Sequence, residues 1–312
     1  MDNRVHIVVP SIAAVWQGDI LAWAFHDIFS SMGFMADVWE GHAPHPDVVD
    51  SNDIFFLIDF DSFEVMGKGW KKKNLRRVIF YNVTRSYDSD ESRRRWMGYH
   101  WNRKRAAYDG NVQHIFDYDP RGASKKFPRP APTTACPWGY HRLFEIREDG
   151  EALADVCFLG WVYRGGRRDG IVSRLEEAGL TVAVCTRYPK TRRQHNDPMR
   201  WVSRARNARA LRAKVFLNIQ TDKKNKTLPL PRIMTGIANR LPIVTEPADW
   251  YPWGDKDFVV VSGKESFPDV IRMLCDSVSF CRTLTDAAYE WAKGEFSLEL
   301  HLRRALRDIG FV

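Results

Sequence analysis

The stretch that decides the fold reads AKVFLNIQ at residues 213–220 and, nine residues later, LPRIMTGIANRLPIVTE at residues 230–246. The first segment is a β-branched and aromatic run, which is typical of a buried strand. The second begins with a pattern of helical period and ends in another short apolar run. A strand at 214–219, a helix at 230–238 and a strand at 241–245 form one βαβ unit, which places both strands in a parallel sheet.

The same alternation extends to both ends of the chain. Strands are predicted at 5–9, 34–39, 54–58, 77–82, 112–116, 156–159, 181–185 and 258–261, and helices at 19–32, 169–178, 199–213 and within 267–309. Residues 119–138 hold five prolines and little periodicity, which indicates an interdomain linker. A chain of 312 residues favours two domains. We expect lobes at 1–140 and 141–290, with a terminal helix at 291–312 that packs back toward the first lobe.

Composition excludes several classes of protein. The longest strongly apolar stretch, residues 53–60, is far shorter than the roughly 20 residues of a membrane span, and residues 1–10 lack a signal-peptide pattern, so we expect a cytoplasmic protein. The five cysteines form no CxxC pair and are expected to be buried free thiols. The histidines lack metal-ligand spacing, which argues against a zinc site.

Positive charge is concentrated in two blocks. Residues 1–67 hold one Lys or Arg against eleven Asp or Glu, whereas residues 68–142 hold eighteen against six and residues 161–240 nineteen against five. Such blocks attract phosphates or polyanions, although most single cations in them serve only as solvated surface.

A glycine-rich loop follows the predicted strand at 156–159. Residues 158–170 contain four glycines interleaved with Arg164, Arg167 and Arg168. Glycines let backbone N–H groups approach a phosphate, the next helix offers its positive end, and arginines neutralise a diphosphate. The loop does not match GxGxxG, and a tight turn with solvated arginines fits it equally well.

Several segments resemble one family of enzymes. Residues 155–160, 175–180, 213–220 and 230–246, with TACPWGYH at 134–141, resemble group 1 glycosyltransferases of the GT-B fold, in particular their spore-maturation-protein-like branch. The resemblance covers roughly the last 180 residues. It implies an α/β protein of two Rossmann-like, doubly wound lobes that face a central cleft. It also implies a nucleotide-diphosphate sugar, UDP- or GDP-linked, bound to the second lobe, with neither a metal nor another cofactor.

The donor-binding residues follow from the resemblance and from predicted loop-to-helix junctions. They are Gly160, Arg164, Arg168, Arg187, Tyr188, Asn218, Lys226, Arg232 and Thr235. The sequence departs from the family at Thr227 and Thr235, where relatives carry a pair of glutamates, the second of which holds the donor ribose. Asp59-Phe-Asp61 has the letters of a metal-binding DxD but follows a strand of the first lobe, where loop capping or acceptor contact is favoured over a metal.

Sugar transfer requires help in deprotonating the acceptor hydroxyl. Asp19, after the first strand, is the lead candidate for the base, with capping of the next helix as its alternative role. His100 is the second candidate. Stereochemistry is open, although the branch leans toward retention.

The acceptor-binding segment is expected at residues 93–105. There Arg93, Arg94 and Arg95 precede Trp96 and Trp101, a combination that can bind a phosphate backbone and stack a displaced base. A hydroxylated base in DNA, such as a hydroxymethyl-pyrimidine, is therefore the lead acceptor, with a glycan, a protein or a small molecule as alternatives. The same residues also fit an amphipathic helix whose aromatic side chains join the core.

Two other functional classes compete with a transferase. A non-catalytic nucleic-acid-binding protein on a Rossmann-like scaffold would explain the charge blocks but not the pattern at 230–246. A flavin- or nicotinamide-dependent enzyme is weakened because neither half has GxGxxG after its first strand.

Overall fold

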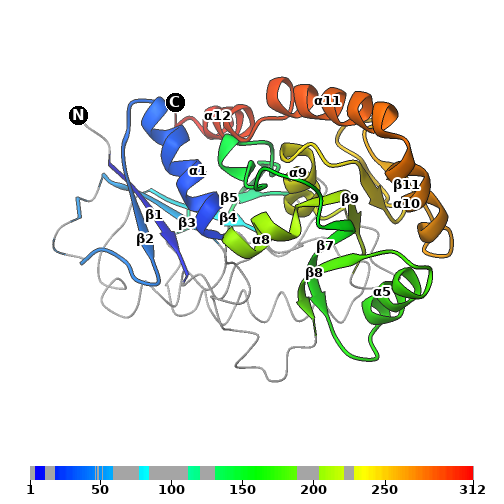
Figure 1. Cartoon of the computed structure of the whole chain (residues 1–312). Helices are drawn as coiled ribbons and strands as arrows, with labels where there is room; N and C mark the ends of the chain where they lie inside the picture. Colours follow the sequence, from blue (N-terminus) through cyan, green and yellow to red (C-terminus); the bar gives the residue numbers. More distant parts are fainter. Residues whose placement is uncertain are drawn as a thin grey trace. The chain divides into compact units, whose positions relative to one another are not determined.

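The computed structural model describes residues 4–10, 18–45, 47, 49–50, 52–58, 77–83, 112–119, 131–187, 204–220 and 228–311. The chain divides into two compact units. Unit 1 comprises Met1–Trp138 and Leu298–Val312, and unit 2 comprises Gly139–Ser297. Each unit contains one parallel sheet with its own helices (Figure 1).

The sheet of unit 1 has the order β2-β1-β3-β4-β5-β6 with every pairing parallel. Its strands are β1 (Arg4–Val9), β2 (Met35–Glu40), β3 (Ile54–Ile58), β4 (Val78–Asn82), β5 (His114–Asp117) and β6 (Thr133–Ala135). The central strands β3 and β4 are buried at every position, as expected of parallel strands that are covered on both faces. Helix α1 (Gly18–Ser31) joins β1 to β2.

The last helix of the chain, α12 (Leu298–Asp308), belongs to unit 1. Its Arg303 donates from Nη2 to the hydroxyl of Ser31 at the end of α1, at 3.2 Å. Beyond the helix, the ring of Phe311 lies 5.3 Å from the guanidinium carbon of Arg77, just before β4. Both ends of the chain therefore build unit 1.

The sheet of unit 2 has the order β11-β10-β9-β7-β8, again fully parallel. Its strands are β7 (Ala154–Val162), β8 (Val182–Arg187), β9 (Ala213–Asn218), β10 (Ile243–Thr245) and β11 (Val260–Val261). Its helices are the 3-10 helix η3 (Arg142–Phe144), α5 (Arg167–Glu177), α8 (Arg204–Ala210), α9 (Leu230–Ala238), α10 (Phe267–Asp276) and α11 (Val278–Gly294).

Both sheets follow the same winding rule. Counting strands within each unit, the order is 2-1-3-4-5, with β6 as an extra edge strand in unit 1. In such open sheets the winding direction reverses between the first and third strands, and ligands bind outside the carboxyl ends of the strands at that switch point. The switch point of unit 2 lies between β7 and β9.

The predicted α/β class with two doubly wound parallel sheets is confirmed. One predicted boundary was wrong, because the helix expected to reach residue 213 ends at Ala210. Ala213 instead pairs with Ala154 and starts β9. A helical pattern that runs directly into a strand contains no residue that marks the change, so the register of the sheet decides it.

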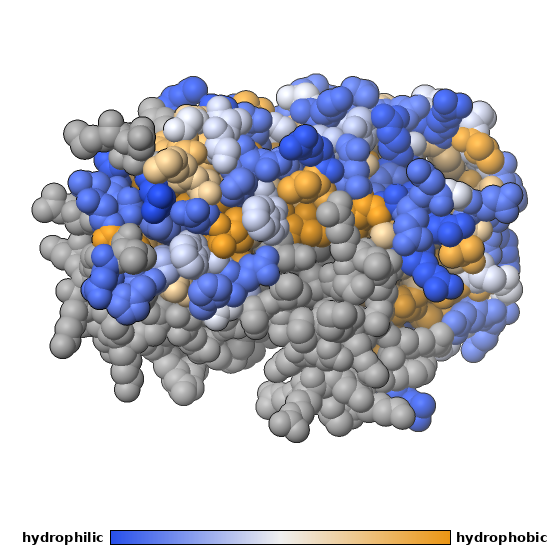
Figure 2. Space-filling view, turned by 60° about the vertical axis from the view of Figure 1, so that its left-hand side comes forward, coloured by the Kyte–Doolittle hydropathy of each residue, from blue (hydrophilic) through white to orange (hydrophobic). Residues whose placement is uncertain are grey.

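The described residues show free cysteines and neither a membrane-spanning helix nor a metal cluster. All five thiols are free; Cys136, Cys157 and Cys185 are buried as expected, whereas Cys275 and Cys281 are partly exposed. No described helix is both long enough and apolar enough to cross a membrane. Within the same residues, no group of three or more His, Cys, Asp and Glu side chains could hold a metal ion. In the view of Figure 2, hydrophilic residues cover most of the coloured surface and hydrophobic residues form small groups.

Candidate functional site

The switch point of unit 2 is built around the ring of Phe158 on β7. The pairing of β7 with β8 shifts register between Phe158 and Trp161, and Gly160 lies inside this irregularity. A Cβ atom on Gly160 would stand 2.6 Å from Cζ of Phe158, closer than real Cβ contacts come. Glycine is therefore required at position 160, because the fully buried Phe158 ring occupies the space of a side chain.

Two guanidinium groups from different helices lie over that ring. The guanidinium carbon of Arg168, in the first turn of α5, is 5.1 Å from the ring centroid, and that of Arg232, in the first turn of α9, is 5.2 Å from it. Both distances fall within the range of a cation–π interaction. Phe158 thus brings two positive charges from separate parts of the sequence to one place.

The same two arginines are anchored at the carboxyl end of β9. Arg168 donates from Nη2 to the carbonyl of Ile219 at 3.2 Å and from Nη1 to that of Trp161 at 3.3 Å. Arg232 donates from Nη1 to Ile219 O at 3.2 Å and to Oδ1 of Asn218 at 2.7 Å. All these acceptors are neutral oxygen atoms, so the contacts orient the guanidinium groups without cancelling their charge.

Asn218 is the buried support of Arg232. It has no exposed surface, and its Nδ2 donates to Oγ1 of Thr245 on the neighbouring strand β10 at 2.8 Å. This bond fixes the orientation of the Asn218 amide, so that its oxygen points toward Arg232. Asn218 therefore presents a defined acceptor to Arg232.

Arg167, next to Arg168, has a different role. It forms an ion pair with Glu246 and donates from Nη1 to the carbonyl of Gln220 at 2.8 Å. Glu246 also accepts from the backbone N–H of Gln220 at 2.8 Å. Arg167 and Glu246 thus brace the segment after β9, and the carboxylate neutralises the Arg167 charge.

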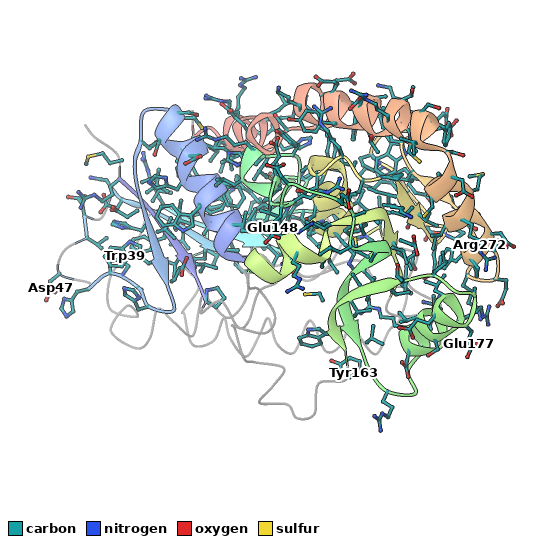
Figure 3. The ribbon with its side chains drawn as sticks, viewed as in Figure 1. Trp39, Asp47, Glu148, Tyr163, Glu177 and Arg272 are labelled. Atoms are coloured by element: carbon teal, nitrogen blue, oxygen red, sulfur yellow. The ribbon has the colours of Figure 1, made fainter. Side chains whose placement is uncertain are left out.

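Helix α5 starts directly at this cluster. Gly165 adopts a positive φ of 69°, and its N–H donates to Oδ2 of Asp169 at 2.8 Å, which shapes the turn before the helix. The first helical hydrogen bond runs from Gly170 N to Gly166 O, so the preceding amides of α5 point away from the helix along its positive end. Figure 3 labels Tyr163, just before this turn, and Glu177 at the other end of α5. A helix start with guanidinium groups beside it is an arrangement that favours anions.

The structure brings four of the predicted donor residues together: Gly160, Arg168, Asn218 and Arg232. Arg164 lies exposed in the turn that precedes α5. Arg187 ends β8 and Asp19 lies in the first turn of α1, but their side chains are outside the described residues. Also outside them are Tyr188, Lys226, Asp59, Asp61, His100, Arg93, Arg94, Arg95, Trp96 and Trp101.

Thr235 is a further predicted donor residue. It is fully buried in α9, and its hydroxyl donates to the carbonyl of Pro231 one turn earlier, at 2.8 Å. A threonine inside a helix commonly makes this bond with its own backbone. The hydroxyl of Thr235 is thus bonded inside the helix, and its contact with a donor sugar stays a prediction.

Sequence reasoning missed a buried polar group in unit 1. Asp117, at the end of β5, has no exposed surface and accepts from Nδ2 of Asn82, at the end of β4, at 3.3 Å. Its other oxygen accepts from the backbone N–H of Asp119 at 3.0 Å. The only sequence signal was DYD at residues 117–119, a second DxD-like pattern at the end of a predicted strand. Without Asn82 on the neighbouring strand β4, this pattern indicates only a loop.

Comparison with known proteins finds similar folds among solved structures. No family model matches the sequence, and no curated protein matches it significantly. Among solved structures, T4 phage β-glucosyltransferase superposes with a TM-score of 0.61 at 12% identity, covering 98% of each chain. HepE of Anabaena, in complex with UDP-glucose, gives 0.63 at 7% identity over 99% of this chain and 100% of that one. Sucrose-phosphate synthase of Thermosynechococcus elongatus gives 0.58 at 12% identity over 99% of both.

These neighbours are GT-B glycosyltransferases, and at such low identity the similarity concerns the fold. The two Rossmann-like units of this chain are therefore of the GT-B type, as predicted. The spore-maturation-protein-like branch stays a prediction.

Proposed function

We propose that this protein is a glycosyltransferase that moves a sugar from a nucleotide diphosphate to an acceptor hydroxyl. The observation that carries the proposal is the pair of guanidinium groups, from Arg168 and Arg232, held over Phe158 at the switch point of unit 2. A diphosphate leaving group gains negative charge as the sugar departs, and preorganised cations stabilise that charge. The GT-B fold supports the same reading, because the neighbouring structures are sugar transferases.

The donor that we propose is UDP-glucose. HepE was solved in complex with UDP-glucose, and a DNA-modifying β-glucosyltransferase was solved in the presence and absence of uridine diphosphoglucose. Arg164, Arg187, Tyr188 and Lys226 are the further donor contacts in this proposal, since each lies in or beside a segment that follows a strand or precedes a helix of unit 2. Thr235, which is buried in α9, stays a predicted contact as well.

We propose transfer without a metal ion. The two arginines and the positive end of α5 supply the positive charge that a cation gives in metal-dependent transferases. The T4 enzyme has also been solved with UDP and Mn²⁺, so metal dependence needs a direct test on this chain. For the acceptor base, Asp19 in the first turn of α1 stays the lead candidate and His100 the second.

The acceptor that we propose is a hydroxymethyl-pyrimidine base in DNA. The basic excess of residues 68–142 supports it, as do Arg93, Arg94 and Arg95 beside Trp96 and Trp101. One structural neighbour is described as a DNA-modifying enzyme. If DNA does not accept the sugar, the proposed acceptor becomes a hydroxyl of a glycan, a protein or a small molecule.

The test of the donor is a thermal-shift screen over UDP-glucose, GDP-glucose and the free nucleotides. A ligand that binds the folded state raises the melting temperature according to its affinity, so UDP-glucose should give a selective rise. No rise with any nucleotide sugar contradicts the transferase proposal. A rise with GDP-glucose alone keeps the transferase and changes the base.

The test of the acceptor uses labelled UDP-glucose with hydroxymethylated and unmodified DNA duplexes of the same sequence. Label should enter only the hydroxymethylated duplex. Binding to DNA should weaken steeply with salt because neutralised phosphates release counterions, and replacing Arg93, Arg94 and Arg95 together should flatten that slope. Absence of DNA binding at low salt removes DNA as the acceptor and leaves the donor chemistry in place.

A further inference from the structure

A cavity lies at the amino ends of strands β9 and β10 of unit 2, whereas the arginine pair lies at the carboxyl end of β9. Its volume is about 500 Å³, and it is formed by the start of β9, the residues before β10 and the junction of α10 with α11. Lys214, at the start of β9, lines this cavity, whereas Asn218, at the end of the same strand, supports Arg232. The two sites therefore lie at opposite ends of one strand. The volume falls in the roughly 300–1,000 Å³ range of small-molecule sites.

The apolar part of the cavity is aliphatic. Leu274, Cys275, Val278 and Cys281 come from α10 and α11, and the described lining includes no aromatic ring. Val278 is 74% exposed, which is unusual for a valine beside a cavity and opens an apolar surface to solvent. Burial raises the pKa of the Cys275 thiol to about 11, so that thiol is neutral and acts as an apolar group. An aliphatic body fits this surface better than a stacking ring.

The charged part of the lining carries four cations, Arg147, Lys214, Arg240 and Arg282. Three of them face carboxylates: Lys214 pairs with Asp155 at 2.8 Å, Arg240 pairs with Asp286, and Arg282 lies 3.9 Å from the same Asp286. Arg147 differs. In the described part of the chain its side chain has no carboxylate partner, and its hydrogen bond is a 3.5 Å contact from Nη2 to the carbonyl of Ala213.

The backbone of Arg147 is held firmly although its guanidinium is only weakly bound. The N–H groups of Ile146 and Arg147 both donate to Oδ1 of the buried Asn239, at 2.8 and 2.7 Å. Asn239 donates in turn to the carbonyls of Phe144 and Thr235 at 2.8 and 2.7 Å. A half-buried guanidinium on a fixed backbone keeps most of its donors for a ligand and loses little entropy when it binds one.

We propose that this cavity binds a single-chain aliphatic carboxylate, with the carboxylate on Arg147 and the chain over Leu274, Val278 and Cys281. The site is separate from the diphosphate site and goes beyond the proposed transfer reaction. Arg147 supplies a fork of donors that matches a carboxylate in two parallel hydrogen bonds. The aliphatic wall supplies the hydrophobic part of the binding free energy.

The test measures binding of dodecanoate below its micelle concentration, by titration calorimetry on the full chain, beside dodecanol and acetate. Dodecanoate should bind, and the two partial ligands should bind at least tenfold more weakly, since each lacks the charge or the chain. Arg147→Gln and Val278→Glu should each weaken dodecanoate binding at least fivefold. Val278 is mostly exposed, so its replacement should leave the melting temperature unchanged.

The matched control is Arg272→Gln. Arg272, labelled on α10 in Figure 3, also donates to a backbone carbonyl, that of Ala178, but does not line the cavity. It should leave dodecanoate binding unchanged. Maleimide labelling of Cys275 and Cys281 gives a second readout, because bound dodecanoate should slow it. Failure of the wild-type chain to bind dodecanoate overturns the proposal, as does equal weakening by the control. UDP-glucose binding, measured on the same variants, reports separately on the transferase proposal and should not change.

Discussion

Arg168 and Arg232 donate to one shared acceptor, the carbonyl oxygen of Ile219, each at 3.2 Å. Arg168 lies in the first turn of α5 and Arg232 in the first turn of α9, so two βα junctions of unit 2 converge on the end of β9. Two like charges that approach one carbonyl and one ring repel each other. An anion bound between the two groups would reduce that repulsion.

The first prediction concerns these two cations. Arg168→Ala and Arg232→Ala should each weaken UDP-glucose binding about 10- to 150-fold, since each removes a charge-assisted contact of about 1.5–3 kcal/mol. Calorimetric titration measures the effect. Arg174→Ala is the control, because Arg174 is also on α5 but pairs with the exposed Glu265. If both site variants bind as the parent protein does, the phosphate assignment is wrong.

The second prediction concerns Gly160. Gly160→Ala should lower the free energy of unfolding by about 1–3 kcal/mol and weaken UDP-glucose binding as well, because the new methyl group displaces the Phe158 ring on which both arginines lie. Gly170→Ala is a matched control on α5, where a Cβ meets nothing within 4 Å. Chemical denaturation and calorimetry measure the two effects. Wild-type stability and affinity in Gly160→Ala would contradict this geometry.

The third prediction concerns metal removal. Sugar transfer should continue in EDTA at an unchanged rate, since arginines and a helix start provide the positive charge. The rate is measured as UDP release, with added Mg²⁺ and Mn²⁺ in parallel. Complete loss of transfer, restored by either ion, would show that the positive charge of Arg168 and Arg232 is insufficient. The candidate metal ligands would then be Asp59, Asp61, Asp117 and Asp119.

The fourth prediction concerns His301 in α12. Burial, with the nearby Arg304, lowers the pKa of His301 from 6.5 to about 4. The unfolded chain therefore takes up a proton near pH 6.5, whereas the folded chain resists it until about pH 4. The resulting stability, on the order of 3 kcal/mol, is present above pH 6.5 and is lost as the pH falls toward 4.

His301→Gln should flatten the pH dependence of the free energy of unfolding across that window. Urea denaturation at half-unit steps of pH measures it. The exposed His42 serves as the control, and His42→Gln should keep the slope. An unchanged slope in His301→Gln would show that His301 does not carry the effect.

The fold was predictable because its signals are local and repeated. Residues 54–58, 156–159 and 214–219 are mostly apolar runs of strand length that alternate with helical patterns, as is typical of buried parallel strands. The grouping of Gly160, Arg168 and Arg232 was predictable because each lies at a predicted strand end or helix start, and their contact with a phosphate stays a prediction.

The distinct roles of neighbouring residues were not predictable. Arg167 and Arg168 are adjacent and chemically identical. Arg167 forms an ion pair with Glu246, which follows β10, whereas Arg168 lies over the Phe158 ring as a candidate phosphate contact. The sequence alone does not distinguish these two roles. Thr235 could not be assigned either, since its hydroxyl finds its acceptor inside α9. The buried position of Asp117 could not be predicted, because its partner Asn82 comes from the neighbouring strand β4.

The position of α12 sets an order of events during synthesis. Unit 2 is a continuous segment and has all its residues once Ser297 has emerged from the ribosome. Unit 1 has to wait for the last helix, because Arg303 reaches Ser31 across 272 positions of the sequence. Unit 1, although translated first, can be completed only once α12 has emerged as well. A nascent chain stalled before α12 would therefore carry a finished second unit and an incomplete first one open to chaperones.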